Sequence, residues 1–235
     1  MLRVLVLDNL SEEGVALFKA AGIETDVKAP QKEQELAAII NDYDGLVIRS
    51  ATKVTAAALE HSTRLKVIGR AGVGTDNVDK DAATKKGIVV MNTPGGNTIS
   101  TCEHAFALML SLCRNIPHAH VSMEQARWDR KKFMGAELFG KTLGVIGVGR
   151  IGGAIAKRAK AFEMRVLAYD PILSPLKAES LGVELVDLDT LLSTSDFITI
   201  HAPKSDKTLN MIAAPQLKKM KPNCRIVNTA RGGII

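Results

Sequence analysis

Cysteine is scarce in this sequence. The three cysteines, Cys102, Cys113 and Cys224, are odd in number and far apart, and none belongs to a CxxC pair. This pattern argues against a disulfide-bonded scaffold and against a zinc site. Because structural disulfides belong to oxidising compartments, a reducing, cytoplasmic location fits best, and we expect no bound metal.

Long hydrophobic runs are missing as well. No apolar stretch reaches the roughly 20 residues that span a bilayer, so we expect no membrane partner. The first residues, Met1–Leu7, lack the extended apolar core and the small-residue cleavage site of a signal peptide. They are instead typical of a buried strand.

Aromatic residues make up only 4% of the chain, and the net charge is +6. The basic residues are scattered, apart from the run Arg130–Lys132. Without a recognition motif, this charge does not predict a nucleic-acid partner, whereas a basic balance suits small anionic ligands through electrostatic steering. With 46% hydrophobic residues among 235, the chain is long enough to bury the cores of two modest domains.

Apolar runs rich in β-branched residues alternate with helical patterns along the chain. The predicted strands are Arg3–Leu7, Glu24–Val27, Gly45–Ile48, Lys66–Gly69, Gly87–Met91, Thr142–Ile146, Arg165–Tyr169, Glu184–Val186, Phe197–Ile200 and Arg225–Asn228. The predicted helices are Ser11–Ala21, Lys32–Ile40, Thr55–His61, Asp79–Lys86, Thr98–Leu112, Ile151–Phe162, Ser174–Leu181, Asp187–Ser193 and Ala213–Met220. Such repeated β-α-β units imply parallel sheets with helices on both faces.

The turn Thr93–Gly96 separates two such series and marks a domain junction. We therefore predict the α/β class with two doubly wound parallel-sheet lobes, a flavodoxin-like lobe over residues 1–94 and a Rossmann lobe over residues 95–235. The second lobe includes the linking helix Thr98–Leu112. Its apolar residues lie on more than one face, which predicts a buried position.

The most informative stretch is a glycine pattern, GxGxxG, formed by Gly147, Gly149 and Gly152. A predicted strand runs into these glycines and a predicted helix leaves them, which is the context that a dinucleotide-binding turn requires. Gly147 permits the tight turn, Gly149 lets the backbone approach a pyrophosphate, and Gly152 lets helix and strand pack closely.

The next strand ends in Asp170. An acidic residue at that strand end is placed to bind both ribose hydroxyls of an adenosine and to repel a 2′-phosphate, so the sequence predicts NAD rather than NADP. The other interpretation is an ordinary glycine-rich turn with a helix-capping aspartate. The variable positions Arg150 and Ile151 would lie beside the pyrophosphate, although a solvated helix start explains Arg150 equally well.

Two further strand ends belong to the same sheet. His201-Ala202-Pro203 follow one strand, and ligands of open α/β sheets bind beyond the carboxyl ends of strands. We expect this loop to form a wall of the cofactor site, while a structural role explains His201 as well. Arg231 follows the next strand and precedes two glycines, where a guanidinium group can bind a carboxylate in bidentate fashion and polarise a carbonyl. A surface arginine on a turn is the alternative.

The first lobe offers loops of its own. Arg49-Ser50 and Arg70–Gly74 each follow a predicted strand, and Gly95–Thr98 opens the long helix. Each alone is typical of a turn. Together they place cations, hydroxyl groups, backbone donors and an amide at strand ends, which suits a small anionic acid.

Together these motifs resemble the D-isomer-specific 2-hydroxyacid dehydrogenases. The resemblance covers essentially the whole chain and rests on Gly144–Gly152, Asp170, His201–Pro203, Asn228–Gly233, Arg49–Val54, Arg70–Asp79, Asn92–Asn97 and Trp128–Gly135. The last four stretches are similar to the branch of the family that acts on 3-phospho-D-glycerate.

The resemblance implies NAD-dependent oxidation of 3-phospho-D-glycerate to 3-phosphohydroxypyruvate, the first step toward L-serine, with a hydride passing from the substrate to the nicotinamide. Arg231 matches the family's catalytic arginine, which binds the substrate carboxylate and carbonyl. The residues expected to contact substrate are Arg49, Ser50, Gly72, Asn97 and Arg231. The residues expected to contact the cofactor are Val73, Gly147, Gly149, Arg150, Ile151, Gly152, Asp170, His201, Ala202, Thr229, Ala230 and Arg231.

The resemblance further implies a homodimer or homotetramer formed through the nucleotide lobe. The basic run Arg130–Lys132 would then approach a neighbouring subunit and help to hold the substrate phosphate. A solvated charge run explains these residues as well.

One departure from the family pattern is serious. Family members use a histidine as general acid/base, oriented by a glutamate, and both follow the Arg-Gly-Gly turn, whereas this sequence ends at Ile235. We assign no residue to that role and expect the second lobe to be incomplete. Because general acid–base catalysis contributes about 10²–10⁴-fold, we expect this chain alone to bind NAD poorly and to turn over negligibly. A dehydrogenase of another D-2-hydroxy acid and a non-catalytic NAD-sensing protein remain alternatives.

Overall fold

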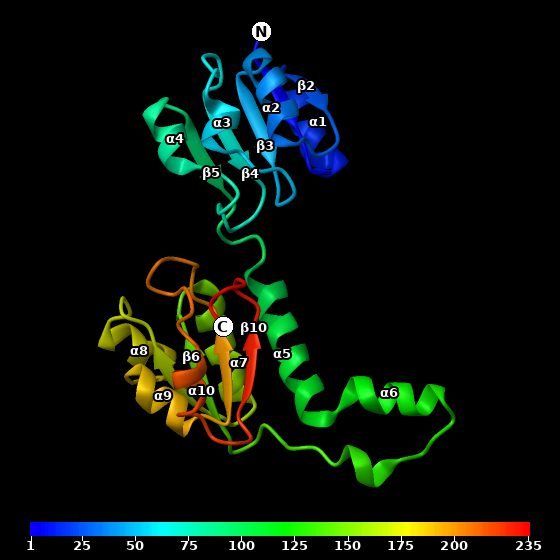
Figure 1. Cartoon of the computed structure of the whole chain (residues 1–235), viewed down its shortest axis with the longest axis vertical. Coiled ribbons are helices and arrows are strands. Elements are labelled where there is room, and N and C mark those ends of the chain that lie inside the picture. Colours follow the sequence, from blue (N-terminus) through cyan, green and yellow to red (C-terminus); the bar gives the residue numbers. More distant parts are fainter. The chain divides into compact units, whose positions relative to one another are not determined.

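The computed structural model describes residues 1–235 and contains two compact units, Met1–Asn97 and Thr98–Ile235. We call them the first and the second unit (Figure 1). Each holds a five-stranded, fully parallel sheet, and the predicted α/β class is confirmed.

The sheet of the first unit has the strand order β2-β1-β3-β4-β5, the flavodoxin-like order that the sequence predicts. Its strands are β1 (Arg3–Val6), β2 (Glu24–Val27), β3 (Gly45–Ile48), β4 (Val67–Arg70) and β5 (Val89–Asn92). Its helices are α1 (Glu12–Ala20), α2 (Glu33–Ile39), α3 (Ala56–Leu59) and α4 (Lys80–Lys85), with a 3-10 turn, η1 (Ile40–Asp42). Leu5, Leu46 and Ile68 on the three central strands are fully buried, as apolar runs in a doubly covered parallel sheet should be.

The sheet of the second unit has the order β10-β9-β6-β7-β8. Its strands are β6 (Thr142–Ile146), β7 (Arg165–Tyr169), β8 (Glu184–Leu185), β9 (Phe197–Ile200) and β10 (Arg225–Asn228). Its helices are α5 (Thr98–Arg114), α6 (Ile116–Glu124), α7 (Arg150–Ala161), α8 (Pro175–Leu181), α9 (Leu188–Thr194) and α10 (Ala214–Leu217), with a 3-10 turn, η2 (Arg130–Phe133).

Two apolar cores lie on opposite faces of this second sheet. Along β7, Val166 and Ala168 belong to the core that includes α5 and α7, whereas Leu167 between them belongs to the core that includes α9. Successive side chains of a strand point to opposite faces, so the alternation shows that both faces are covered. The second unit is therefore doubly wound, as predicted.

The segment between α5 and β6 differs most from the sequence-based expectation, which places no element there. The structure forms α6 and η2 in this segment, and α6 extends away from the sheet (Figure 1). Asn115 reverses the chain in the left-handed region with φ +53°, and Pro117 lies in the first turn of α6. We call residues 115–135 the arm. The helix α10 is also shorter than the predicted Ala213–Met220 and ends at Leu217.

The structure has no helix that is both long and apolar enough to cross a membrane. It also has no group of three or more His, Cys, Asp or Glu side chains arranged to hold a metal ion.

Candidate functional site

The turn from β6 into α7 contains the three glycines of the GxGxxG pattern. Gly147 has φ +86°, and a Cβ added there would lie 2.8 Å from the backbone nitrogen of Ala202. A Cβ on Gly152 would overlap the carbonyl oxygen of Gly147, so this glycine lets α7 pack directly on the turn. Around Gly149 an added Cβ would meet no atom within 4 Å. The backbone is therefore closely packed at two glycines and open to a ligand at the third.

The N-terminus of α7 begins at this open glycine. Gly149 is the N-cap, Arg150 and Ile151 are the first helical residues, and the Arg150 side chain is exposed. The free backbone N–H groups and the positive end of the helix dipole attract anions. The guanidinium group of Arg150 adds a formal positive charge at the same helix end.

Asp170 lies directly after β7, and its carboxylate is held by the backbone. Oδ2 accepts a hydrogen bond from the N–H of Val148 at 2.8 Å, and Oδ1 accepts one from Ile172 at 2.9 Å. These bonds fix the carboxylate beside the glycine turn and leave lone pairs for further donors. A carboxylate held in this way can bind a ribose diol and repels a phosphate in its place.

His201 follows β9, the neighbour of β6. Its backbone N–H donates to the carbonyl of Ile146 at 2.8 Å, and its Nε2 lies 2.8 Å from Oγ1 of Thr199. Burial lowers the pKa of His201 to about 4, so the ring is neutral at pH 7. Its Nδ1 is buried and has no hydrogen-bond partner.

A side chain organises the turn after β10. The amide of Asn228 accepts a hydrogen bond from the N–H of Ala230 at 3.0 Å and donates one to the carbonyl of Arg231 at 2.8 Å. Arg231 itself is exposed, and its Nη1 donates to the carbonyl of Ala230. Oγ1 of Thr229 is buried without a partner. In the register of the two strands, Thr229 lies opposite His201, so two unsatisfied polar atoms follow adjacent strands.

All of these groups lie at the carboxyl ends of β6, β7, β9 and β10, which we call the carboxyl edge. The strands β6 and β9 are neighbours that are not consecutive in the chain, and such a switch point is where ligands of open α/β sheets bind. An open glycine, a helix N-terminus, a fixed carboxylate and two buried atoms without partners together suit a dinucleotide.

The first unit has polar residues at the carboxyl end of its own sheet. Arg49 and Ser50 directly follow β3, and both side chains are exposed. Arg70 is the last residue of the neighbouring strand β4, where it pairs in register with Ile48. A Cβ on Gly72 would overlap Nη1 of Arg70, so the guanidinium group lies over this glycine. Two guanidinium-bearing residues therefore lie at the carboxyl ends of adjacent strands.

Two more predicted residues lie on the following loops. The carbonyl of Val73 accepts a hydrogen bond from the Asn92 side chain at 2.7 Å, and the carbonyl of Gly72 accepts one from the N–H of Thr93 at 3.0 Å. The end of β5 thus holds the 70–74 loop in place. Asn97 is exposed and directly precedes α5.

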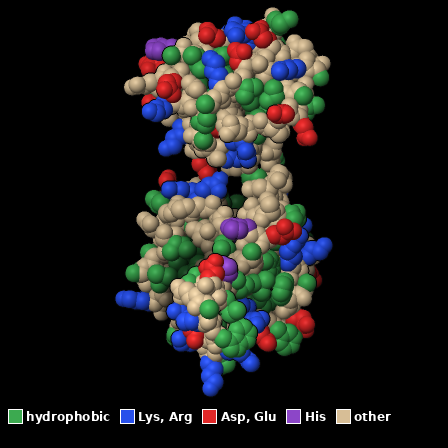
Figure 2. All heavy atoms as spheres, turned by 90° about the vertical axis from the view of Figure 1, so that its right-hand side faces the viewer, with side chains coloured by type: hydrophobic (Ala, Val, Ile, Leu, Met, Phe, Trp, Pro, Cys, Tyr) green, Lys and Arg blue, Asp and Glu red, His purple; other side chains and the backbone are tan.

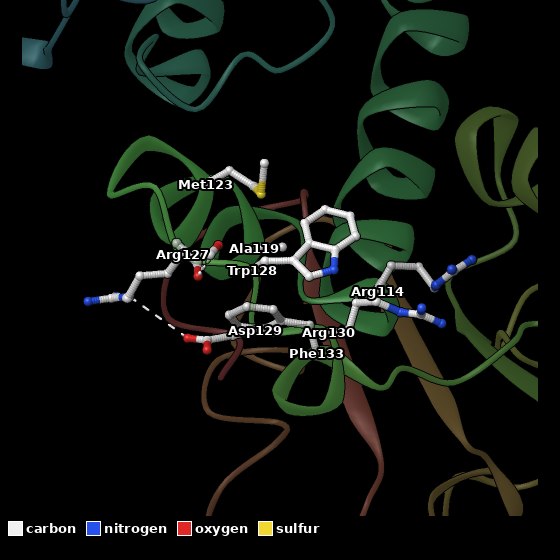
Figure 3. Close-up of a pocket in the computed structure, with 9 residues that line it drawn as sticks. Arg114, Ala119, Met123, Arg127, Trp128, Asp129, Arg130 and Phe133 are labelled. Carbon is white, nitrogen blue, oxygen red and sulfur yellow. Dashed lines mark hydrogen bonds and ion pairs between the residues drawn. The ribbon is translucent and has the colours of Figure 1, made fainter.

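The arm of the second unit carries a pocket of its own, with a volume of about 270 Å³. Its lining includes Arg114, Met123, Trp128, Arg130 and Phe133. In Figure 3 the side chains of Arg114 and Arg130 extend in the same direction, whereas Arg127 points toward Asp129. Figure 2, which looks toward the arm, shows hydrophobic side chains gathered on this face of the second unit.

The predicted cofactor residues other than Val73 lie at the carboxyl edge of the second unit, and the predicted substrate residues other than Arg231 lie on the loops of the first unit. Two participants were not predicted. Arg70 was named only as part of a loop, and Asn228 only as part of a motif. The placement of Arg70 depends on the space above Gly72, which no local pattern encodes. Asn228 could have been identified from the sequence. Asparagine is favoured in turns because its side chain can accept a hydrogen bond from the backbone N–H two residues further along the chain.

Comparison with known proteins identifies relatives of both units. A family model described as D-isomer specific 2-hydroxyacid dehydrogenase, NAD binding domain, matches residues 106–235. A D-3-phosphoglycerate dehydrogenase of Archaeoglobus fulgidus is 53% identical over 234 residues, covering 100% of this chain and 44% of that protein. One of Synechocystis is 50% identical over 235 residues, covering 100% and 42%. The chain thus spans less than half the length of these curated relatives.

Solved structures show the same fold. The TT0316 protein of Thermus thermophilus has a TM-score of 0.91 and 31% identity, covering 100% of this chain and 75% of that one. A D-lactate dehydrogenase of Aquifex aeolicus complexed with NAD and lactic acid has a TM-score of 0.86 and 30% identity, covering 99% and 70%. The NAD-binding family model and this NAD-bound relative confirm NAD as the cofactor predicted from Asp170 and the glycine turn.

Proposed function

Because the chain belongs to the D-isomer-specific 2-hydroxyacid dehydrogenase family, we propose that it forms part of an enzyme that oxidises 3-phospho-D-glycerate to 3-phosphohydroxypyruvate with NAD. One observation carries the choice of substrate. Relatives named D-3-phosphoglycerate dehydrogenase align with the whole chain at about 50% identity, including the loops of the first unit. A likeness confined to the nucleotide-binding unit would support only the cofactor.

For the cofactor, we assign the pyrophosphate to the open turn at Gly149 and the N-terminus of α7, with Arg150 and Ile151 beside it. Asp170 binds the adenosine ribose. The other predicted contacts are Val73, Gly147, Gly152, His201, Ala202, Thr229, Ala230 and Arg231. NAD, when bound, supplies the hydride acceptor.

For the substrate, we assign Arg231 to the carboxylate and the adjacent oxygen of C2. A planar guanidinium group binds a carboxylate through two parallel hydrogen bonds and stabilises charge that develops on the neighbouring oxygen. Arg49, Ser50 and Asn97 contact the rest of the molecule, and Gly72 completes the predicted set. Gly72 acts indirectly, because it leaves room for the guanidinium group of Arg70.

No general base is assigned among residues 1–235. His201 follows β9 at the carboxyl edge, but its burial lowers the pKa to about 4, and Nε2 is engaged with Thr199. A base that works near neutral pH needs a pKa closer to 7. His201 is better suited to orienting a bound group than to accepting a proton.

We further propose that the protein is a homo-oligomer that uses the arm. Trp128 is 75% exposed, and Met134 is 83% exposed. Large apolar side chains gathered on an exposed segment indicate a protein interface, and tryptophan is enriched at such sites. A second copy is the proposed partner, with Arg130–Lys132 reaching its substrate phosphate.

Trp128→Ala tests the assembly. We expect this variant of the full-length protein to shift toward the monomer in sedimentation velocity. Ile172→Ala is the matched control, because Ile172 is 93% exposed on the same unit but lies outside the arm. An unchanged sedimentation coefficient for Trp128→Ala would contradict the assigned interface.

NAD-linked turnover tests the reaction itself. We expect the full-length protein to reduce NAD with 3-phosphoglycerate at a kcat/KM far above that for D-glycerate or D-lactate. Preference for an unphosphorylated acid would assign another substrate within the family. NAD binding without turnover of any of these acids would indicate an NAD-sensing protein.

A further inference from the structure

A buried carboxylate of the first unit lies directly beneath the Arg49-Ser50 loop. Asp8 follows β1 and is only 6% exposed. Its backbone is in the left-handed region with φ +64°, and Asn9 follows with φ +54°. Aspartate and asparagine tolerate this conformation better than most residues, but it is still unfavourable for a side chain with a Cβ. The conformation directs a charged group away from solvent.

Asp8 binds both ends of a four-residue segment that begins after β3. Its Oδ2 accepts hydrogen bonds from the N–H groups of Arg49 at 2.9 Å and Thr52 at 3.0 Å. Its Oδ1 accepts one from the hydroxyl of Thr52 at 2.6 Å. Thr52 is fully buried, whereas Ser50 and Ala51 between the two anchor points are exposed.

Asn77 binds the carbonyl groups of the same segment, whereas Asp8 binds its N–H groups and the Thr52 hydroxyl. Its Nδ2 donates to the carbonyl of Arg49 at 2.8 Å and to the carbonyl of Thr52 at 2.6 Å. Just beyond the segment, Val54 pairs with Val78 in an isolated β-bridge. The N–H and C=O groups of both Arg49 and Thr52 are therefore all bound by two side chains from distant parts of the sequence.

We propose that Asp8 and Asn77 are positioning residues, which clamp the backbone of Arg49 and Thr52 so that Arg49 and Ser50 are held ready for an anionic substrate. The inference rests on the proposed function, because that function assigns Arg49 and Ser50 to the substrate. Neither positioning residue needs to touch the ligand.

The clamp reduces the conformational entropy that the 49–52 segment would otherwise lose when the substrate binds. The 49–52 segment is exposed at Ser50 and Ala51, and an exposed loop with free backbone groups samples many conformations. Five hydrogen bonds restrict this one to a single path. A preorganised site binds more tightly than a flexible one with the same contacts. Loosening the clamp should weaken binding of the substrate without affecting binding of NAD.

Asp8→Gly removes the carboxylate and keeps a residue that favours positive φ. Asn9→Gly is the matched control, since Asn9 also has positive φ but makes none of the five bonds. Asp8→Asn is the conservative variant, because its amide oxygen can accept both N–H bonds and its NH₂ can donate to the Thr52 hydroxyl. Asn77→Asp removes the two hydrogen bonds that the Asn77 amide donates, because the new carboxylate is an acceptor and faces the carbonyls of Arg49 and Thr52.

Hydrogen exchange of the full-length protein measures directly how firmly the clamp holds the backbone of residues 49 and 52. In Asp8→Gly and Asn77→Asp, we expect amide exchange of residues 49 and 52 to accelerate at least tenfold, with smaller changes in Asn9→Gly and Asp8→Asn. Unchanged exchange in both clamp variants would overturn the proposal, whatever the protein's substrate is.

Steady-state kinetics measure the effect of the clamp on substrate binding. We expect the KM for 3-phosphoglycerate to rise about tenfold in Asp8→Gly and Asn77→Asp, with the KM for NAD unchanged and the wild-type value largely restored in Asp8→Asn. Faster exchange with an unchanged substrate KM would show that the clamp is only structural and overturn its positioning role. If the wild type does not act on 3-phosphoglycerate, the proposed function fails, and the same comparison is made with whichever D-2-hydroxy acid it oxidises. If it oxidises none, the positioning role fails as well.

Discussion

The guanidinium group of Arg70 occupies the space in which a side chain on Gly72 would begin, since an added Cβ would overlap Nη1. The two residues are joined by a turn in which the N–H of Gly72 donates to the carbonyl of Arg70 at 2.8 Å. A glycine at position 72 therefore determines where a cation lies at the end of β4. This offers a reason for the glycine that does not require it to touch a ligand.

Gly72→Ala should therefore change binding more than stability. The end of an arginine side chain can swing away at little energetic cost, so we expect a melting temperature within about 2 °C of wild type. The displaced cation should raise the KM for 3-phosphoglycerate about tenfold. Gly69→Ala is the control, because a Cβ there would meet its nearest atoms at 3.9 Å. Equal substrate KM values for wild type and Gly72→Ala would contradict this account.

The type and approximate position of most helices and strands followed from the sequence because both depend on local patterns. Apolar runs such as Gly45–Ile48 form buried parallel strands, and the predicted and observed ranges of that strand agree. The arm was missed for the opposite reason. α6 buries only Ser122, so it lacks the apolar stripe that makes an amphipathic helix recognisable.

The chemistry of the sites was only partly predictable. The glycine spacing predicted the turn at Gly147–Gly152, and an acidic strand end predicted Asp170. The hydrogen bond from Val148 to Asp170 joins residues that follow two different strands, so it depends on the tertiary structure. The same is true of Asp8, which binds a segment more than 40 positions away. Contacts of this kind require the folded sheet and cannot be inferred from local spacing.

Gly149 and Gly152 should respond in opposite ways to the same substitution. Gly149→Ala places a methyl group in open space, so the protein should stay folded and lose affinity for NAD by about tenfold or more, because a ligand approaches there. Gly152→Ala drives a methyl group into the carbonyl oxygen of Gly147 and should destabilise the unit by about 1–3 kcal/mol. Thermal unfolding and NAD titration of both variants check the contrast. Similar melting temperatures for the two variants would contradict the assigned roles.

Asp170→Asn should weaken discrimination between NAD and NADP. The substitution keeps an acceptor for Val148 but removes the negative charge that repels a 2′-phosphate. Hydrogen bonds to charged groups contribute about 1.5–3 kcal/mol, so we expect the KM for NAD to rise about 10- to 100-fold and the ratio of NADP to NAD activity to rise as well. Measurement of both cofactors at saturating substrate checks this. A rise in the KM for NAD with an unchanged cofactor ratio would leave Asp170 without a role in selectivity.

The His201 ring should remain neutral across the physiological range. Burial lowers its pKa to about 4 from the ordinary value of 6.5, so protonation opposes folding. Its contribution to stability is present above pH 6.5 and is lost as the pH falls toward 4. In a two-dimensional NMR titration, we expect the His201 ring resonances to stay constant from pH 8 to about 5. A midpoint near 6.5 for His201 would contradict its buried environment.

Asp44 should make the stability of the first unit depend on pH in the acid range. Its Oδ2 accepts a hydrogen bond from the N–H of Arg3 at 2.8 Å, and both carboxylate oxygens bind the guanidinium group of Arg64. The Arg64 hydrogen bonds, followed by the backbone bond, lower the pKa of Asp44 to about 2 from the ordinary 3.8. A lowered carboxyl pKa stabilises the folded state above the unfolded-state value, and this stabilisation is lost as the pH falls from about 4 to 2.

Asp44→Asn removes that titration while keeping a side chain of the same shape. We expect the variant to unfold at a lower urea concentration than wild type at pH 7, and the difference to shrink steadily below pH 4 until the two converge near pH 2. Asp42→Asn is the control, because Asp42 is exposed and takes no part in the Arg3 and Arg64 bonds. Its urea midpoint should follow wild type throughout. A difference for Asp44→Asn that stays constant from pH 7 to pH 2 would mean that the loss comes from the altered shape of the hydrogen bonds, and that the carboxylate charge at position 44 contributes nothing to folding.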